Sequence, residues 1–548
     1  MNKKALLSGG IFAFIGCLLF LGSMAVNRTY FERLAYDSVF SYQFRQLLAV
    51  IVLYGLGFLF LLLIRDTLSP GWTALFAFPA GIFLWVIPSL LLLLLGIPYT
   101  FPLTMTLIAA LLGGLYIHMR FRRRRRGLPA AAMQALPHLL LFLGFAFLVA
   151  TGFTYSFVSY DSYFYFINYG NTLTIVRNFQ DIVGTNSFTL TNISQFLPLL
   201  HSYTAFWGLD QGFQVQAFLM YNIAACFFYG LYRYLLRQSV QQKRALLLSA
   251  LFTLLLVSCT SFIIISSWVL ANMYCMAYIF LLVLASFLVS HLDGSRRDSL
   301  LLIGMCFISL TLLRKDGIIF AAFFLICFTC VELFPRRQLV LVFLPAVLAE
   351  AWWLFYVRVI LDPGVTQAVF SSIANNKNIF FVALIIIGSY LYLFVGHPLM
   401  QWFVKKFPKL TEYYILLFGM FLLFVYSFVK KQDVIIDNVD FVIRNMFRQP
   451  SSWGISGFIF AGLLALSLVR KFELDHLHFL WSGYAFLNLI SYCIVDSKWF
   501  WLNWDDSYNR VLLQIVPVFV FVTAVKSLAL LQSDTPDHSC VSLTGDAQ

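Results

Sequence analysis

Residues 47–64 read LLAVIVLYGLGFLFLLLI, and Arg65 follows them directly. This stretch has no charged side chain, and about 20 such residues in an α-helix span the hydrocarbon core of a bilayer. Similar stretches recur along the whole chain, so that hydrophobic residues make up 61% of the 548 residues and charged residues 11%. This composition excludes a water-soluble fold around a single buried core and indicates a membrane protein with many spans.

The spanning element is predicted to be the α-helix. The apolar runs are about 20 residues long and lack the alternating pattern of about ten residues that is typical of outer-membrane barrels. We therefore predict an all-α fold, a polytopic transmembrane helical bundle with about 16 spans. The predicted spans are centred near residues 15, 54, 85, 110, 148, 224, 256, 281, 306, 325, 349, 388, 420, 461, 488 and 520.

Basic residues predict the side of the membrane on which each loop lies, because cytoplasmic loops carry an excess of Lys and Arg. If Lys3 and Lys4 are inside, the run Arg120 to Arg126 is inside too, and the alternation holds along the chain. Both termini are then cytoplasmic, and residues 158–212 face outward from a multi-pass plasma-membrane protein. The net charge of +13 fits anchoring among membrane lipids, so no nucleic-acid partner is expected.

Charge and hydropathy divide the chain into four predicted parts. The arginine run separates an N-terminal extension of four membrane helices, residues 1–135, from a catalytic membrane module, residues 136–361, that contains the outer loop 158–212. Residues 362–532 form a variable C-terminal set of transmembrane helices. Residues 533–548, rich in Ser, Asp, Thr and Gly, are predicted to be a disordered cytoplasmic tail.

The outer loop begins near Tyr160-Asp161-Ser162-Tyr163. A carboxylate where a long loop leaves the bilayer can act as a base on a substrate that arrives from the lipid. Asp161 could equally cap the aromatic segment that begins at Tyr163, which suits an interfacial helix. Further along, the segment that ends at His201 re-enters the membrane region and could line a cavity, although packing accounts for each of its residues singly.

A second candidate is the tight turn Arg314-Lys315-Asp316-Gly317, which lies outside although it is basic. Arg grips a phosphate oxyanion with two hydrogen bonds and Lys binds it as a point charge, so the turn suits a phosphate or pyrophosphate. The alternative is that both side chains extend to lipid headgroups.

Two further sites complete the candidates. Arg510 precedes the last span, and its neighbours Asp505 and Asp506 could pair with it or ligate a divalent cation. Glu350 is predicted near the middle of a span, where a charge is costly unless it is neutral, paired or beside a polar cavity. No P-loop or dinucleotide-binding glycine motif occurs, so nucleotide hydrolysis is not supported.

These motifs, in this order, resemble the GT-C superfamily of integral-membrane glycosyltransferases. In that family an Asp begins a large first outer loop, as Asp161 does here, and a later outer turn carries an Arg-x-acid-Gly pattern that Arg314 to Gly317 matches. Tyr508-Asn509-Arg510 echoes its C-terminal Arg-Tyr pattern in reversed order. The acid usually follows the first helix, whereas Asp161 follows the fifth predicted span, and the family's second acidic residue beside it is missing.

The resemblance implies a polyprenyl-phosphate-linked sugar donor, an acceptor hydroxyl on a glycan, lipid or protein, and an inverting displacement. By this resemblance Asp161 is the base, and Arg314, Lys315 and Arg510 bind the donor phosphate. The missing second acid leaves a divalent cation an open question and no other cofactor is expected. Two other functions stay open: a flippase for lipid-linked glycans or other transporter, and an O-antigen-type polymerase or ligase. The polymerase would use a late outer loop with the basic residues Lys430, Lys431, Arg444 and Arg448.

Overall fold

A computed structural model provides the structure of the chain. It describes residues 3–33, 39–65, 67–121, 128–152, 167–179, 181, 195–209, 213–259, 262, 271–292, 294–314, 316–356, 376–407, 412–448, 453, 455–469, 483 and 511–533. Asp161, Tyr163, Lys315, Asp505, Asp506 and Arg510 lie outside these residues, as do the tail 534–548 and the predicted span near residue 488.

The described residues form helices and turns without a strand, which confirms the predicted all-α bundle. The helices are α1 (Lys3–Arg33), α2 (Val39–Ile64), α3 (Pro70–Leu94), α4 (Phe101–Phe121), α5 (Leu128–Gly152), α6 (Asn168–Val176), α8 (Phe196–Phe206), α9 (Phe213–Arg237), α10 (Gln242–Val257), α12 (Ala271–His291), α13 (Arg296–Leu313), α14 (Gly317–Cys330), α15 (Arg336–Phe355), α17 (Asn376–Leu391), the π-helix η3 (Tyr392–Gly396), α18 (His397–Lys406), α19 (Glu412–Lys430), α20 (Gln432–Ile443), the π-helix η4 (Arg444–Arg448), α21 (Ile455–Val469) and α24 (Val516–Ser533).

Nine helical stretches among the described residues are long and apolar enough to cross a membrane. They lie in α1, α2, α3, α4, α9, α12, α15, the continuous run α17–η3–α18, and α19. Every predicted span centre other than the one near residue 488 falls inside a described helix. Length and composition therefore support a membrane protein.

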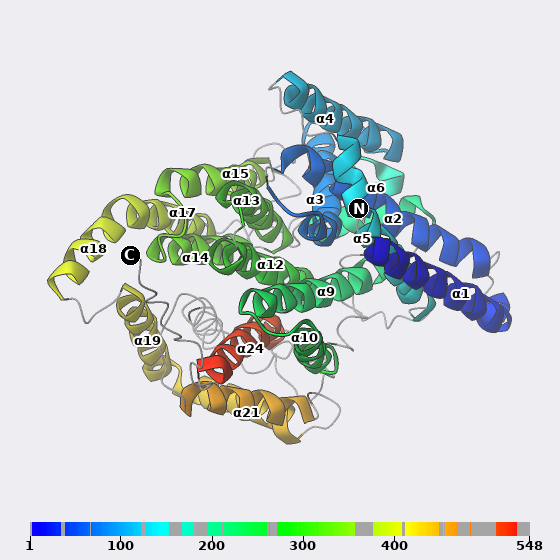
Figure 1. Ribbon diagram of the computed structural model, residues 1–548. Helices are drawn as coiled ribbons and strands as arrows, with labels where there is room; N and C mark the ends of the chain where they lie inside the picture. The colour runs from blue at the N-terminus through cyan, green and yellow to red at the C-terminus, as the bar shows by residue number, and fades with distance from the viewer. Residues whose placement is uncertain are drawn as a thin grey trace, which may run out of the picture.

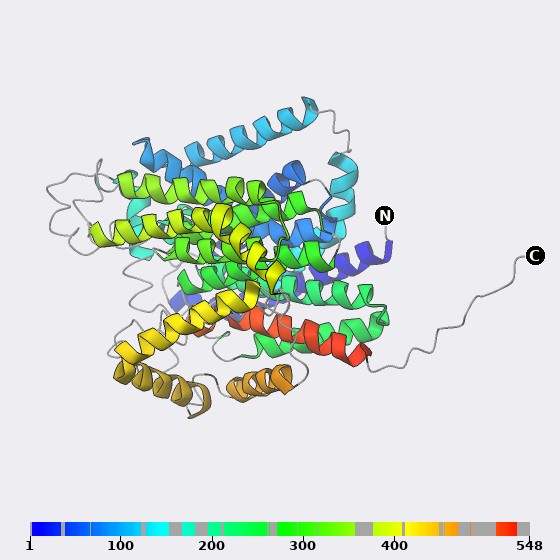
Figure 2. The same cartoon turned by 90° about the vertical axis from the view of Figure 1, so that its left-hand side faces the viewer.

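The axes of most helices are roughly parallel to one another (Figure 2). The N-terminal helices lie on one side of the bundle, and α18, α19 and α21 lie on other sides (Figure 1). Helix α12 lies in the interior, where every residue from Met273 to Leu288 is buried. A helix that is apolar on all sides packs well only when it is surrounded. Helix α19 is equally apolar but lies at the periphery, where most of its side chains are exposed in the isolated chain.

The N-terminal helices pack closely on the rest of the bundle. Helix α1 runs along α5, and a side chain at Gly16 would collide with the backbone of Gly144. Such small residues allow close backbone approach between membrane helices. Helix α5 also contacts α2, α3 and α9. The predicted boundary at residue 135 falls inside α5, because the arginine run that suggested it lies just before that helix.

Hydrogen bonds of the described turns mark two ends of the bundle. At one end, Asp298 accepts hydrogen bonds from the amides of Thr67 and Leu68, both at 2.8 Å, and Arg237 donates to the carbonyl of His291 at 2.7 Å. We call this the basic end. At the other end, the amide of Tyr99 donates to the carbonyl of Arg177 at 2.8 Å. We call it the opposite end, and it carries the described candidate residues.

Candidate functional site

The turn between α13 and α14 holds Arg314 in a fixed orientation. Its Nε donates to Asp316 Oδ1 at 2.7 Å and its Nη2 to Asp316 Oδ2 at 2.8 Å, a two-point ion pair. Its Nη1 donates to Asn272 Oδ1 in the first turn of α12. The side chains of Arg314 and Asp316 are 27% and 38% exposed. Arg314 is thus held by two partners at the rim of the bundle, and it is less exposed than an ordinary turn arginine.

Gly317 explains why the turn can be so tight. A side chain at Gly317 would collide with the carbonyl of Leu310 and the Cα of Thr311 in the last turn of α13. The amide of Gly317 donates to the carbonyl of Arg314 at 2.9 Å, which closes the turn. The absence of a side chain at this position therefore lets α14 start directly against the end of α13.

Asn272 was not among the sequence-based candidates. It is a single polar amide at the start of a long apolar helix, and this contrast is the sequence feature that could have identified it. Its importance became visible only once the structure brought α12 beside the turn after α13. Cys275, one turn further along α12, is buried close to both Arg314 and Asp316.

The two described helices of the predicted outer loop 158–212, α6 and α8, are firmly anchored at the same end. Tyr169 of α6 donates a hydrogen bond to Gln195 at 2.9 Å, and the hydroxyls of Tyr99 and Ser202 lie 2.5 Å apart. Trp85 of α3 donates to the carbonyl of Leu199 at 3.1 Å. Residues Phe196 to Thr204 of α8 are all buried. These residues pack inside the bundle, while the prediction that the segment re-enters the membrane region stays a prediction.

Helix α8 meets α12 close to the Arg314 turn. The ring of Phe196 lies 6.4 Å from that of Tyr274 and 5.9 Å from that of Tyr278, centroid to centroid. Asn272, which binds Arg314, is in the same part of α12. Helix α8 also contacts α13. The first turns of α12 thus contact both the Arg314 turn and α8 of the predicted outer loop.

His201 is buried in this region, 2% exposed, and neither ring nitrogen has a hydrogen-bond partner among the described residues. Burial without a charged partner favours the neutral form of the imidazole. A neutral ring offers one donor and one acceptor. His201 lies against Gly170 of α6, where a side chain would collide with it.

Two more buried polar groups lie on the neighbouring helices. The hydroxyls of Tyr274 on α12 and Thr311 on α13 also lack hydrogen-bond partners within the described part of the chain. Their residues are 0% and 2% exposed. Buried polar groups are normally satisfied by protein, water or ligand, and each unsatisfied one costs about 1–3 kcal/mol. The junction of α8, α12 and α13 is therefore more polar than an ordinary membrane-protein core.

Glu350 lies on the face of α15 that buries Leu339, Phe343 and Ala346, and it is 7% exposed. The sequence places it near the middle of a span that ends at Arg358. Residues 357–375 lie outside the described part of the chain, so its depth in the membrane stays a prediction. Helices α13 and α15 run in the same direction, with the rings of Phe307 and Phe343 5.7 Å apart. Two turns beyond that pair, they bring Arg314 and Glu350 to about the same level.

The remaining candidates stay predictions, because Asp161, Tyr163, Lys315, Asp505, Asp506 and Arg510 lie outside the described residues. Among the residues that the structure does describe, no group of three or more His, Cys, Asp or Glu side chains is placed to hold a metal ion. Of the described candidates, the structure brings Arg314, His201 and Glu350 to one end of the bundle.

Comparisons with known proteins do not assign a family. Models of protein families, curated proteins and solved structures were each compared with the chain, and none of them matches it.

Proposed function

We propose that this protein is a membrane glycosyltransferase with a GT-C-like fold of about 16 spans. It would move a sugar from a polyprenyl-phosphate donor to an acceptor hydroxyl at the outer face of the plasma membrane. The observation that carries the proposal is the position of Arg314. It is held by Asp316 and Asn272 at the same end as α6 and α8, which belong to the predicted outer loop 158–212 that contains Asp161.

The proposed reaction is a single displacement at the anomeric carbon. The acceptor oxygen forms a bond to that carbon while the bond from carbon to phosphate oxygen breaks, and the hydroxyl proton passes to Asp161. The leaving polyprenyl phosphate takes the bonding electrons, and Arg314, Lys315 and Arg510 stabilise its charge. A positioned base contributes about 10²–10⁴-fold, and loss of one oxyanion partner costs about 10²–10³-fold.

Asp316 has a positioning role in this proposal. A carboxylate that binds guanidinium at two points fixes the plane of the group as well as its position. Asp316 holds Nε and Nη2 of Arg314, while Asn272 holds Nη1 from α12. An arginine fixed in this way needs little reorganisation when charge develops on a nearby phosphate, which favours electrostatic stabilisation of the transition state.

The test replaces Asp161 by Asn in the full-length protein. Asn keeps the size of the side chain and can still cap a helix, so a purely structural role predicts a mild effect. A base predicts a fall of at least about a hundredfold in transfer, with donor binding retained. The measurement compares lipid-linked donors, by mass spectrometry, in cells with the wild-type protein, the variant and no protein.

Accumulation of the same donor in the variant and in the deletion supports the proposal. Wild-type donor levels with Asp161→Asn would mean that Asp161 only caps a helix. The candidates for the base would then be Glu350, Asp505 and Asp506. No change of any lipid-linked sugar on deletion would remove the glycosyltransferase proposal itself.

The polymerase alternative has one described element in its favour, the basic segment from α19 to η4. Arg444 there pairs with Asp440 at 2.7 Å, and both side chains are nearly half exposed. Loss of activity on neutralising this segment, with Asp161→Asn fully active, would favour the polymerase.

A further inference from the structure

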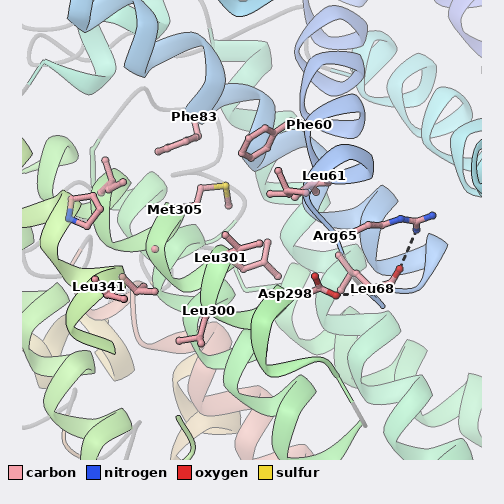
Figure 3. A pocket seen from close by; sticks show the side chains of 16 residues that line it. Phe60, Leu61, Arg65, Leu68, Phe83, Asp298, Leu300, Leu301, Met305 and Leu341 are labelled. Atoms are coloured by element: carbon pink, nitrogen blue, oxygen red, sulfur yellow. Dashed lines mark hydrogen bonds between the residues drawn. The ribbon is translucent and has the colours of Figure 1, made fainter. Parts of the chain in front are cut away.

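A groove at the basic end combines an apolar channel with a cationic mouth. Its inner compartment, about 270 Å³, lies between α2, α3, α13 and α15 and is lined by Phe60, Phe83 and Met305 (Figure 3). A second compartment, about 550 Å³, adjoins it. The two share Leu300, Leu301, Leu341 and Val342 in their walls, so they form one continuous depression.

The mouth of the groove is positively charged. Arg296 and Arg297 line the second compartment from the first turn of α13, and both are exposed. Neither side chain makes an ion pair or hydrogen bond within the described part of the chain. Arg336 and Arg337 begin α15 beside the lining residues Pro335 and Gln338. Two basic pairs therefore start the two helices that border the compartment.

Hydrogen bonds hold the base of the groove. Asp298 is 4% exposed and accepts the amides of Thr67 and Leu68, so its charge is turned toward the α2–α3 turn. Arg65 Nη1 donates to the carbonyl of Leu68 and to Thr73 Oγ1, both at 3.0 Å. Figure 3 shows Arg65, Leu68 and Asp298 together on one side of the pocket. These bonds fix α13 against the α2–α3 turn and so fix the width of the groove.

We propose that this groove binds an anionic phospholipid. Arg296 and Arg297 hold the phosphate of its headgroup, and one acyl chain lies along Leu301 and Leu341 toward Met305. Basic pockets between membrane helices on the cytoplasmic side suit such headgroups. This end is the predicted cytoplasmic one.

The shape of the groove favours a lipid over a soluble anion. Leu301 and Leu341 are 40% and 65% exposed in the isolated chain, so the apolar part opens to the surroundings directly below the arginines. A free phosphate would use the charged mouth alone and leave this apolar wall uncovered. An acyl chain covers it while its own headgroup meets the positive charge. The proposal is independent of glycosyl transfer, because the groove lies at the other end of the bundle.

The test measures lipid binding to the purified full-length protein in detergent by native mass spectrometry. The probes are long-chain phosphatidylglycerol, phosphatidylcholine with the same chains, and inorganic phosphate. The wild type should retain phosphatidylglycerol in preference to phosphatidylcholine. The double variant Arg296→Gln/Arg297→Gln should bind phosphatidylglycerol about thirtyfold more weakly, since each basic residue near an anionic headgroup contributes about fivefold.

The double variant Lys243→Gln/Arg244→Gln is the matched control. These residues are also an exposed basic pair in the first turn of a basic-end helix, α10, but they line none of the described cavities. This control should bind phosphatidylglycerol as the wild type does. An equal loss in both double variants would mean that the arginines attract headgroups without a site, which overturns the proposal.

The apolar half of the site has its own variant. Leu301→Trp adds bulk inside the groove without a change of charge, and it should weaken phosphatidylglycerol binding at least tenfold while the protein stays folded by size-exclusion chromatography. Unchanged binding by this variant would overturn the proposed place of the acyl chain. Inorganic phosphate that competes fully with phosphatidylglycerol at equal concentration would show a simple anion site and exclude the lipid.

Discussion

At the scale of single residues, the ion pair between Arg314 and Asp316 predicts that one substitution affects transfer activity more than stability. Asp316→Asn removes the charge that orients the guanidinium but leaves Arg314 in place. We expect transfer to fall about tenfold, less than the 10²–10³-fold expected for Arg314→Ala. The free energy of unfolding should fall by about 1 kcal/mol at most, because the pair is partly exposed. Transfer assays and thermal unfolding measure the two effects.

A second aspartate–arginine pair supplies the control for this prediction. Asp440 and Arg444 lie 2.7 Å apart on the surface of α20 and η4, within the segment that the polymerase alternative would use. Asp440→Asn should leave transfer unchanged and alter stability by a similar small amount. Equal activity loss in both variants would mean that Asp316 has no special relation to the site.

Gly317 allows a purely steric prediction at the same scale. Gly317→Ala places a methyl group against the backbone of Leu310 and Thr311, which cannot move aside without a shift of α13 or α14. We expect a loss of about 1–3 kcal/mol in stability, typical of overpacking. Gly388→Ala in α17 is the control, since a side chain there meets nothing within 4 Å. Thermal unfolding of the two variants in the same detergent tests the difference, and equal melting temperatures would contradict it.

At the scale of helices, a buried polar cluster joins α14, the π-helix η3, α18 and α19. His397 Nδ1 lies 2.8 Å from Glu412, and its Nε2 lies 3.3 Å from Glu332. Tyr392 donates to Glu412, and Gln401 donates to it at 3.1 Å. The side chain of Glu412 is 3% exposed and that of Glu332 is 60% exposed. Tyr392 is the first residue of η3, so its hydrogen bond to Glu412 ties the π-helix to α19.

The two carboxylates beside His397 are expected to differ in their contribution to stability. Glu412→Leu removes a buried acceptor that serves three donors, so we expect a loss of about 3–5 kcal/mol and detachment of α19 from α18. Glu332→Gln changes an exposed carboxylate and should cost less than about 1 kcal/mol. Thermal unfolding and limited proteolysis near residues 407–412 measure both. Equal effects would contradict the central role of Glu412.

At the scale of the whole molecule, the two ends of the bundle predict an orientation that labelling can test. Ile175 is 78% exposed at the opposite end, and Ser239 is exposed at the basic end. In a background without reactive cysteines, Ile175→Cys should react with a membrane-impermeant maleimide on intact cells. Ser239→Cys should react only after permeabilisation, because the basic end is predicted to be cytoplasmic. The reverse pattern would place the Asp161 loop inside the cell and remove the proposed outward-facing site.

The sequence predicted the helices well, because the membrane restricts which backbone structures are possible. A backbone in hydrocarbon must satisfy its own hydrogen bonds, so each apolar run becomes a helix regardless of its neighbours. The sequence also identified the Arg314 turn and the buried segment before His201. The depth of Glu350 stays a prediction, because the residues that follow α15 lie outside the described part of the chain. The boundary predicted at residue 135 falls inside α5, and the division of the chain into four parts stays a prediction.

The composition and spacing of the apolar runs determined by themselves that this is a helical membrane protein, and they located residues that could carry chemistry. Only the tertiary structure decided which helices touch. Helix faces that contact other helices and faces that contact lipid are both apolar, so hydropathy along the sequence does not distinguish them. The tertiary structure placed Asn272 beside Arg314, paired Glu412 with His397, and set Arg296 and Arg297 at the mouth of a groove. Those contacts join residues that are far apart or unremarkable in the chain, and packing alone brings them together.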